Sequence, residues 1–284
     1  MNRVRGIVGA VALLCGTTSA ARAGERDFVV YVPGMGASAA QARPYLDRFA
    51  ALLDQRLGWT GGGANFTFVD EAPALGEVLS THKPGFGLLP PSYFLSLSCG
   101  KKAQVTPVAA VVGLAGSGDS AGRYHLVVKR GGATSLEGLK GKRLSSNHLQ
   151  DSRFLSRVVF DGKVDVDKDF QLRSTSSPIT PLKQVDRGEA DAALIDDAQL
   201  ANMKALPFGQ DLVAVFSSEE LPPFPLVAFE AASRPADRAA LRGTLLTLCQ
   251  SPEGAPVCKE MQIVRFAPVE ARRYQAGIVK YCRP

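Results

Sequence analysis

The sequence has no lysine- and arginine-rich tract, and its three histidines, His82, His125 and His148, lie far apart. The missing basic tract argues against nucleic acid as a partner. The wide spacing of the histidines argues against a zinc site, whose ligands usually occur in closely spaced pairs. None of the cysteines stands in a Cys-x-x-Cys motif, and no third glycine completes a dinucleotide-binding loop after residues 34–36. We therefore expect neither a metal nor a cofactor.

Long hydrophobic runs are also missing beyond residue 23, so we expect no membrane-spanning helix there. Before that point, arginines precede an apolar run at 7–15, and Ala21-Arg22-Ala23 fits the small-x-small cleavage pattern. This arrangement predicts a secretory signal peptide at 1–23 and an exported, periplasmic protein that begins near Gly24. Cys15 does not indicate a lipoprotein, because Leu14 precedes it where a lipobox has Gly or Ala.

Four cysteines follow the predicted signal peptide: Cys99, Cys249, Cys258 and Cys282. An even number of cysteines in an exported chain favours disulfides. The sequence allows three pairings. Our first choice is Cys249 with Cys258, which closes a short loop and leaves Cys99 with Cys282. The formal net charge of the chain, +6 at pH 7, is mildly basic and suits an anionic ligand.

Apolar segments and helical patterns alternate from residue 28 onward, which predicts a parallel sheet covered on both faces. The expected order is strand 28–32, helix 39–57, strand 65–69, helix 73–81, strand 86–89 and a short helix that ends at Cys99. Residues 105–114 and 124–129 are then predicted to form a hairpin around a loop rich in Gly, Ser and Asp.

The middle of the chain predicts a second α/β unit, with strands at 142–145, 170–173 and 190–195. After Asp197 the chain is expected to return to the first lobe through strands 212–216 and 226–229. We therefore predict an α/β protein with two lobes, the second inserted in the first. Lobe 1 is expected to contain 24–106 and 200–284, lobe 2 to contain 107–199, and the crossovers to lie near 105–110 and 195–200.

The segment 135–160 is the first candidate for half of a ligand site. It predicts a strand, a polar loop and a helix whose apolar face contains Phe154, Leu155 and Val158. Asp151 or Ser152 stands where the helix N-cap should be. Free backbone N–H groups and the positive end of the helix dipole make such a helix N-terminus suitable for an anion.

Several motifs occur together in an order that is typical of one family. They are Ser-Leu-Glu-Gly-Leu-Lys-Gly-Lys-Arg at 135–143, Pro-Tyr-Leu at 44–46, Gly-Leu-Leu-Pro-Pro-Ser-Tyr at 87–93 and Val-Asp-Arg-Gly-Glu-Ala-Asp-Ala-Ala at 185–193. With them the chain resembles, over roughly residues 27–248, the periplasmic substrate-binding proteins of ABC transporters, in the phosphonate/phosphate-type branch of the type II fold. The resemblance implies a non-enzymatic Venus-flytrap protein. It would act as a monomer that captures a small anion for an ABC permease in the inner membrane.

The resemblance also implies roles for individual residues. An anionic head would be gripped by Ser145, Ser146, Asp151 and Ser152. Tyr93 would contact the ligand from the first lobe, and Asp196 or Asp197 would meet the ligand's amine. This sequence departs from the family at 147–152, where an Asp replaces part of a Ser/Thr-rich loop and would repel a phosphonate unless it only caps the helix; Arg153 could compensate. The candidate ligand-binding residues are Met35, Gly36, Ser92, Tyr93, Ser145, Ser146, Asn147, His148, Asp151, Ser152, Arg153, Ser176 and Asp196.

Two other functions stay open. The same bilobal module could be a sensor or scaffold without a transport role. The Gly-x-Ser-x-Gly pattern at 118–122 could make Ser120 the nucleophile of a serine hydrolase. A nucleophile elbow needs a helix after it, however, and a predicted strand follows here, which favours a plain loop.

Overall fold

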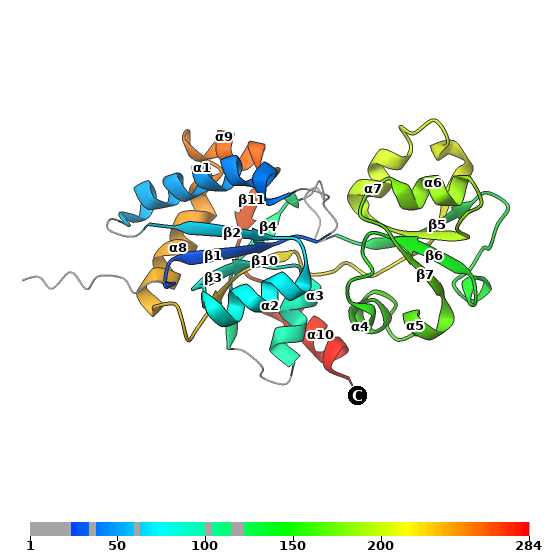
Figure 1. Ribbon diagram of the computed structural model, residues 1–284, viewed down its shortest axis with the longest axis horizontal. Coiled ribbons are helices and arrows are strands. Elements are labelled where there is room, and N and C mark those ends of the chain that lie inside the picture. Colours follow the sequence, from blue (N-terminus) through cyan, green and yellow to red (C-terminus); the bar gives the residue numbers. More distant parts are fainter. Residues whose placement is uncertain (1–23, 34–37, 60–62, 100–103, 115–121, 284) are drawn as a thin grey trace, which may run out of the picture.

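The structure is a computed structural model and describes residues 24–33, 38–59, 63–99, 104–114 and 122–283. It contains two α/β lobes that lie side by side and are joined by extended chain segments (Figure 1). The predicted signal peptide, Met35, Gly36 and Ser120 lie outside the described residues. Within the described ranges, no helix combines the length and the apolar composition that crossing a membrane requires.

The first lobe is built on a sheet with the strand order β11–β4–β10–β3–β1–β2. β1 runs parallel to β2 and β3, whereas β10 and β11 pair with their neighbours in antiparallel fashion. The strands are β1 (Asp27–Tyr31), β2 (Asn65–Val69), β3 (Phe86–Leu88), β4 (Val105–Val112), β10 (Phe224–Phe229) and β11 (Arg265–Ala267). The helices are α1 (Ala39–Leu57), α2 (Ala72–Thr81), α3 (Pro91–Ser98), α8 (Pro235–Leu248), α9 (Gly254–Glu260) and α10 (Ala271–Cys282).

Helices cover both faces of this first sheet (Figure 1). Phe28 and Val30 of β1 pack in a cluster with apolar residues of α1 and α8. Val29 and Tyr31 join another cluster that includes residues of α2, α3 and α10. Because successive side chains of a strand point to opposite faces, a continuous apolar run is what a strand buried on both faces requires.

The second lobe is built on a sheet with the strand order β7–β6–β8–β5–β9. β6 is parallel to β7 and β8, and β5 is antiparallel to β8 and β9. The strands are β5 (Tyr124–Lys129), β6 (Arg143–Ser146), β7 (Gln171–Ser174), β8 (Ala192–Asp196) and β9 (Leu212–Ser217). The helical segments are η3 (Glu137–Leu139), α4 (Ser152–Phe154), the π-helical turn η4 (Leu155–Val159), α5 (Val166–Asp169), α6 (Thr180–Asp186), α7 (Asp197–Met203) and η5 (Gly209–Asp211).

The predicted hairpin of residues 105–114 and 124–129 is wrong, because its two strands belong to different sheets. β4 pairs with β10 and β11 in the first sheet, and β5 pairs with β8 and β9 in the second. The segment between them therefore crosses from one lobe to the other. Two apolar strands around a Gly-rich loop fit a hairpin and a crossover equally well, because the local pattern does not specify the pairing partner.

The return of the chain to the first lobe also lies later than expected. The strand predicted at 212–216 for the first lobe is β9, which pairs with β5 in the second sheet. The second crossover thus runs between Ser217 and Phe224, not near 195–200. The first crossover begins at Gly113 and not near 105–110, because those residues belong to β4 of the first sheet. The φ of Gly113, +89°, favours glycine, and an added Cβ would lie 2.4 Å from Cγ2 of Val264.

Two disulfides are present, Cys99–Cys282 and Cys249–Cys258. They are the pairings that the sequence analysis ranked first. Cys99–Cys282 ties the end of α3 to the last residue of α10, whereas Cys249–Cys258 ties the end of α8 to α9.

Candidate functional site

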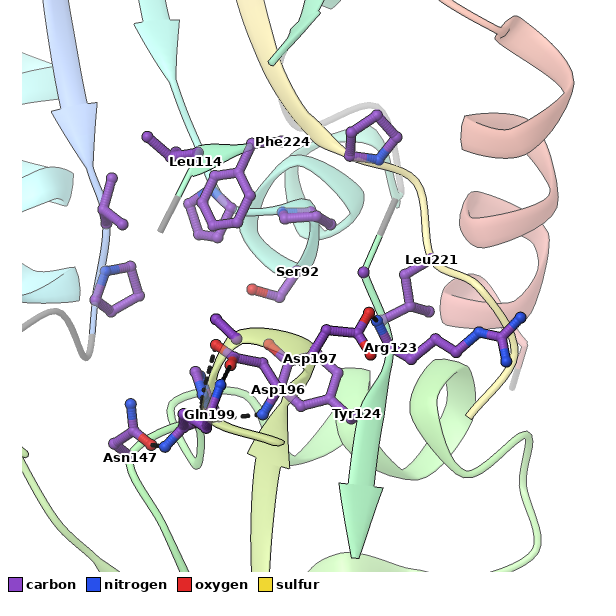
Figure 2. A pocket seen from close by; sticks show the side chains of 18 of the residues that line it. Ser92, Leu114, Arg123, Tyr124, Asn147, Asp196, Asp197, Gln199, Leu221 and Phe224 are labelled. Carbon is purple, nitrogen blue, oxygen red and sulfur yellow. Dashed lines mark hydrogen bonds and ion pairs between the residues drawn. The ribbon is translucent and has the colours of Figure 1, made fainter. Parts of the chain in front are cut away.

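A cavity of about 400 Å³ lies between the lobes and is lined by both of them (Figure 2). The first lobe contributes residues at the ends of β1, β3 and β4, and the second lobe contributes residues at the ends of β6 and β8. Ligands of open α/β sheets bind outside the carboxyl ends of parallel strands, so this is the expected place for a site. The crossover segments supply further lining residues, among them Arg123 and Leu221.

The start of α7 forms the centre of the second-lobe wall. Asp196 is the N-cap: its Oδ1 accepts from Gln199 N at 2.8 Å, and its own N–H donates to Gln199 Oε1 at 3.0 Å. His148 Nε2 lies 2.8 Å from Gln199 Oε1 and 3.5 Å from Asp196 Oδ2. The ring of Tyr124 meets that of His148 edge to face, with centroids 5.1 Å apart.

The pKa of Asp196 is lowered in this setting. Burial acts to raise the pKa of Asp196, but the hydrogen bond and charge of His148, together with backbone N–H groups of α7, outweigh it and hold the pKa below its ordinary value. Gln199 Nε2 also donates to Asn147 Oδ1 at 3.1 Å. The capping box thus fixes one carboxylate, one imidazole and one amide on the same wall of the cavity.

The carboxylate of Asp197 lies within hydrogen-bond distance of a buried histidine, His125. His125 Nε2 lies 2.7 Å from Asp197 Oδ1, and His125 Nδ1 lies 2.8 Å from Ser217 Oγ. Arg123 N–H donates to Asp197 Oδ2 at 2.8 Å. The Arg123 side chain itself is exposed and extends away from Asp196 and Asp197 (Figure 2). Its guanidinium therefore does not neutralise the two carboxylates at the cavity.

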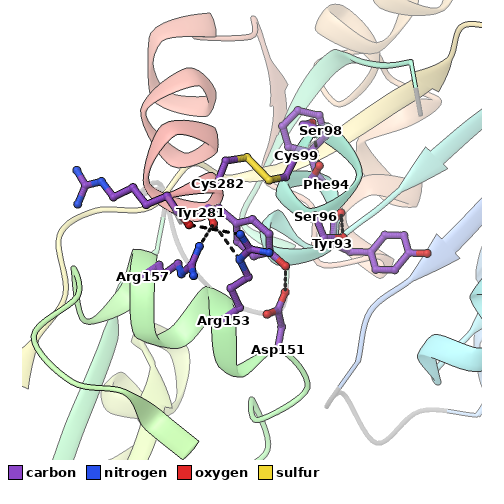
Figure 3. Close-up of a disulfide and its surroundings, with 11 residues drawn as sticks. Tyr93, Phe94, Ser96, Ser98, Cys99, Asp151, Arg153, Arg157, Tyr281 and Cys282 are labelled. Atoms are coloured by element: carbon purple, nitrogen blue, oxygen red, sulfur yellow. Dashed lines mark hydrogen bonds between the residues drawn. A yellow bond between two sulfur atoms is a disulfide. The ribbon is translucent and has the colours of Figure 1, made fainter. Parts of the chain in front are cut away.

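Asp151 is the third carboxylate of the cavity lining. Of the two predicted N-cap candidates, Asp151 and Ser152, it is Asp151 that caps the helix, because its Oδ1 accepts from Phe154 N at 2.8 Å. Its Oδ2 accepts from the hydroxyl of Tyr281 at 3.1 Å, which brings α10 of the first lobe to the second lobe (Figure 3). Burial raises the pKa of Asp151 in spite of these hydrogen bonds and of Arg153. Burial and the charge of Asp151 raise the pKa of Tyr281 to about 12.

Arg153 is engaged with α10 and is not among the residues that line the cavity. Its Nε donates to the carbonyl of Tyr281 at 3.1 Å, and its guanidinium lies over the Tyr281 ring, 5.1 Å from the centroid. Arg157 Nη1 donates to the same carbonyl at 3.2 Å. Lys280 of α10 adds ion pairs with Asp161 and Glu219. The end of α10 is therefore a polar contact between the lobes.

The predicted residues that the structure describes fall into two groups. Those in the cavity lining are Ser92, Asn147, His148, Asp151 and Asp196. Tyr93, Ser145, Ser146, Ser152, Arg153 and Ser176 are not in it.

The serines that follow β6 are used within the second lobe. Ser145 and Ser146 are fully buried and donate to Gln184 Oε1 and to the carbonyl of Leu194, each at 2.6 Å. Ser176 is exposed, and the Tyr93 ring packs edge to face on that of Tyr31.

Sequence reasoning missed Gln199, His125 and Tyr281. Asp196 followed three residues later by Gln199 is a capping-box pattern, which could have placed Gln199 beside the cavity. No local pattern could have found the other two. His125 reaches Asp197 through strand pairing, and Tyr281 reaches Asp151 across 130 residues. Within the described ranges, no group of three or more His, Cys, Asp or Glu residues could hold a metal ion.

The start of α3 places a polar group, the Ser92 hydroxyl, on the first-lobe wall. Its N-cap is Pro90, which supplies no side-chain hydrogen bond, and Pro91 and Ser92 follow in the first turn. The N-termini of α4 and α7, in contrast, are capped by Asp151 and Asp196. Among the described residues, no side chain caps the positive end of α3, and this end lies at the cavity next to the Ser92 hydroxyl.

Comparison with known proteins agrees with this architecture. The family model described as "ABC transporter, phosphonate, periplasmic substrate-binding protein" matches residues 19–274. The chain belongs to this family. Substrate-binding proteins of phosphonate transporters are solute-binding proteins of the periplasm, and the family assignment carries the transport role and the periplasmic location with it. No curated protein matches the chain significantly.

Solved structures share the two-lobed type II fold of this phosphonate-transporter family. XAC2383 from Xanthomonas citri, bound to ATP, is 15% identical, with a TM-score of 0.71 over 90% of this chain and 97% of that chain. PhnD1 from Prochlorococcus marinus, in complex with methylphosphonate, is 14% identical, with a TM-score of 0.61 over 89% and 96%. The aliphatic sulphonate binding protein SsuA from Escherichia coli is 16% identical, with a TM-score of 0.51 over 91% and 83%. At these identities the likeness establishes the fold: α/β, two-lobed, periplasmic binding protein type II.

Proposed function

We propose that the protein captures a small phosphonate that also carries a positively charged nitrogen, holds it between the lobes and delivers it to an ABC permease. One observation carries the proposal. Asp196 and Asp197 lie on one side of the cavity and Ser92, at the uncapped start of α3, lies on the other (Figure 2). Carboxylates suit an ammonium group, and an open helix N-terminus suits a phosphonate.

Electrostatics favour the first-lobe wall for the anion, although the family resemblance assigns its head to Ser145, Ser146 and neighbours. Those two hydroxyls already donate within the second lobe. A phosphonate on the second-lobe wall would approach Asp151, Asp196 and Asp197. Two like unit charges 4 Å apart repel by about 4 kcal/mol at an effective dielectric constant of 20. At the same distance, a carboxylate attracts an ammonium group with an energy of similar size.

We further propose how the molecule works around this ligand. Residues 1–23 direct export, and the protein acts as a monomer. The lobes close about the crossovers that follow Val112 and Ser217. The moving lobe is then the unit that contains β5 to β9, which begins and ends later in the chain than the lobe 2 of 107–199 expected from the sequence.

Isothermal titration calorimetry at pH 7 with 2-aminoethylphosphonate and ethylphosphonate tests the proposed ligand class. The two compounds differ only in the amino group. We expect the amine to bind at least about tenfold more tightly, because about 1.4 kcal/mol of attraction suffices for that ratio. Equal or tighter binding of ethylphosphonate would overturn the proposal, and so would binding of neither compound.

The variant Asp196→Asn tests the assigned carboxylate. Asn can still cap α7, so the helix is kept while the charge is removed. We expect the preference for the amine to shrink several-fold. Asp167→Asn is the matched control, because Asp167 is an exposed carboxylate of the second lobe outside the cavity. The control should leave the preference unchanged.

A sensor or scaffold protein would use the same cavity but would have a different partner. Genes for an ABC ATPase and permease beside this one would support transport, and their absence would favour a sensor. The family is one of solute-binding proteins, which argues against the hydrolase that Ser120 suggested. Ser120→Ala with an ester substrate tests that possibility directly.

A further inference from the structure

We propose that the ligand carries a branched or aromatic carbon body in addition to its charged groups, so that the protein prefers bulky aminophosphonates to the smallest ones. This inference rests on the proposed function and specifies the substrate class. It comes from a difference between the two walls of the cavity.

The first-lobe wall is apolar. Apart from Ser92 and Gln262, its described lining residues are Val32, Pro33, Pro90, Pro91, Val111, Leu114 and Phe224. Every charged residue in the described lining comes from the second lobe or from the first crossover. In Figure 2, Leu114 and Phe224 lie on one side of Ser92, and Asp196, Asp197 and Gln199 lie on the other. The two walls therefore offer a ligand opposite kinds of contact.

Prolines further reduce the number of hydrogen-bond donors that the apolar wall can offer a ligand. Pro33, Pro90 and Pro91 have no backbone N–H, so three positions on this wall cannot donate a hydrogen bond even from the main chain. A ligand group that needs hydrogen bonds would lose water there without replacement, which is unfavourable. A hydrocarbon group would gain from the same burial. Among the described residues, the polar side chains of the first-lobe wall are thus Ser92, at the start of α3, and Gln262.

The size of the cavity agrees with this division of contacts. Its volume of about 400 Å³ lies within the range of pockets that enclose drug-sized molecules, about 300–1,000 Å³. Methylphosphonate carries one carbon atom and phosphate carries none, so neither has a hydrocarbon body to cover the apolar residues of the first-lobe wall. Such a small ligand would leave the apolar wall in contact with water inside the closed cleft.

A series of 1-aminoalkylphosphonates tests the inference by calorimetry at pH 7. The members share one head and carry hydrogen, methyl, isobutyl or benzyl on the carbon next to phosphorus. We expect the dissociation constant to fall at least about tenfold from hydrogen to isobutyl or benzyl, since each buried CH₂ group favours binding about fourfold. A flat or rising dissociation constant would overturn the inference while leaving the proposed function intact. Binding of no member, together with no binding of 2-aminoethylphosphonate, would instead reject the proposed function.

The variant Phe224→Ala locates the effect on the apolar wall. We expect it to weaken the isobutyl and benzyl members about fivefold or more and to leave the hydrogen member within about twofold, because only the larger bodies reach the wall. Phe208→Ala, which removes a half-buried phenylalanine of the second lobe outside the cavity, is the matched control and should change neither. Equal weakening of all members by Phe224→Ala would overturn the inference. If that variant fails to melt cooperatively, Phe224→Leu replaces it, with the same ordering expected at smaller size.

Discussion

The two disulfides connect very different parts of the molecule. Cys249–Cys258 joins residues 9 apart in sequence, and both cysteines pack with one cluster of the first lobe. Cys99–Cys282 joins residues 183 apart, and the chain between them contains the whole second lobe. Cys249–Cys258 fixes a local turn, whereas Cys99–Cys282 fixes the end of α10.

The residues around Cys99–Cys282 show why the position of this bridge matters for the site. Tyr281, next to Cys282, contacts Asp151 and Arg153 of the second lobe, and Asp151 lines the cavity (Figure 3). A disulfide that holds α10 therefore also holds a contact between the lobes. Cys249–Cys258 has no such neighbour among the described second-lobe residues. The comparison predicts that changes near Cys282 reach the second-lobe wall of the site through Asp151, whereas changes near Cys258 reach only its first-lobe wall, through Gln262.

Removing each bridge separately should give the largest contrast. In the loop-entropy model, a bridge that closes a longer loop restricts the unfolded chain more. We expect Cys99→Ser with Cys282→Ser to lower the free energy of unfolding by about 5 kcal/mol, and Cys249→Ser with Cys258→Ser to lower it by about 2.5 kcal/mol. Urea denaturation of the two double variants measures both values.

The control for this pair is the wild-type protein under reducing conditions, which should lose about as much stability as the two variants together. Equal losses in the two double variants would mean that loop length does not set the difference. The two bridges would then differ only in the residues that pack around them.

The local pattern of the chain predicted most elements but not how the strands pair. The bounds of α1 and β2 agree with prediction, because a helical apolar stripe and a short strand between turns leave clear periodicities. The disulfides were predicted from loop length. The assignment of β4 and β5 to a hairpin, and of β9 to the first lobe, failed because strand partners are chosen by long-range packing.

The candidate site was predictable where function and local structure coincide. Asp151 was predicted from local helix capping and Asp196 from the family resemblance; both line the cavity, and each caps a helix there. Ser145 and Ser146 show the limit of that reasoning. A serine after a strand can face a ligand or hydrogen-bond inward, and only the packing of α6 and β8 decides that both donate inward.

Two tyrosines of α10 allow a finer test of the contact between the lobes. Tyr281 donates to the carboxylate of Asp151 at 3.1 Å, and Tyr274 donates to the carbonyl of Pro223 at 3.0 Å. A hydrogen bond to a charged group is worth about 1.5–3 kcal/mol, and one to a neutral group about 0.5–1.5 kcal/mol. We expect Tyr281→Phe to lower the free energy of unfolding more than Tyr274→Phe. Chemical denaturation at pH 7 compares the variants, and the reverse order would show that Asp151 does not depend on α10.

Asp151 and Asp196 should give the smallest effects, with opposite dependence on pH. The folded state raises the pKa of Asp151 through burial, so the stability that this group contributes is present below its unfolded pKa of about 3.9 and is lost as the pH rises through the folded value. The folded state lowers the pKa of Asp196, so its contribution is present above about 3.9 and is lost as the pH falls. Relative to Asp151→Asn, the wild type should therefore lose stability from pH 3 to pH 7. Relative to Asp196→Asn, it should gain stability over the same range.

The pH dependence of Asp151 can also be measured in the variant that lacks the Cys99–Cys282 bridge. The wild type and Asp151→Asn are then compared with and without Cys99→Ser and Cys282→Ser. If the bridge keeps α10 over Asp151, its removal should hydrate the carboxylate and flatten the pH dependence, because burial is the main cause of the raised pKa. Removal of Cys249–Cys258 should leave the dependence as it is. An unchanged slope in both double variants would mean that Asp151 is buried by the second lobe itself, and the influence of Cys99–Cys282 would then end at chain entropy.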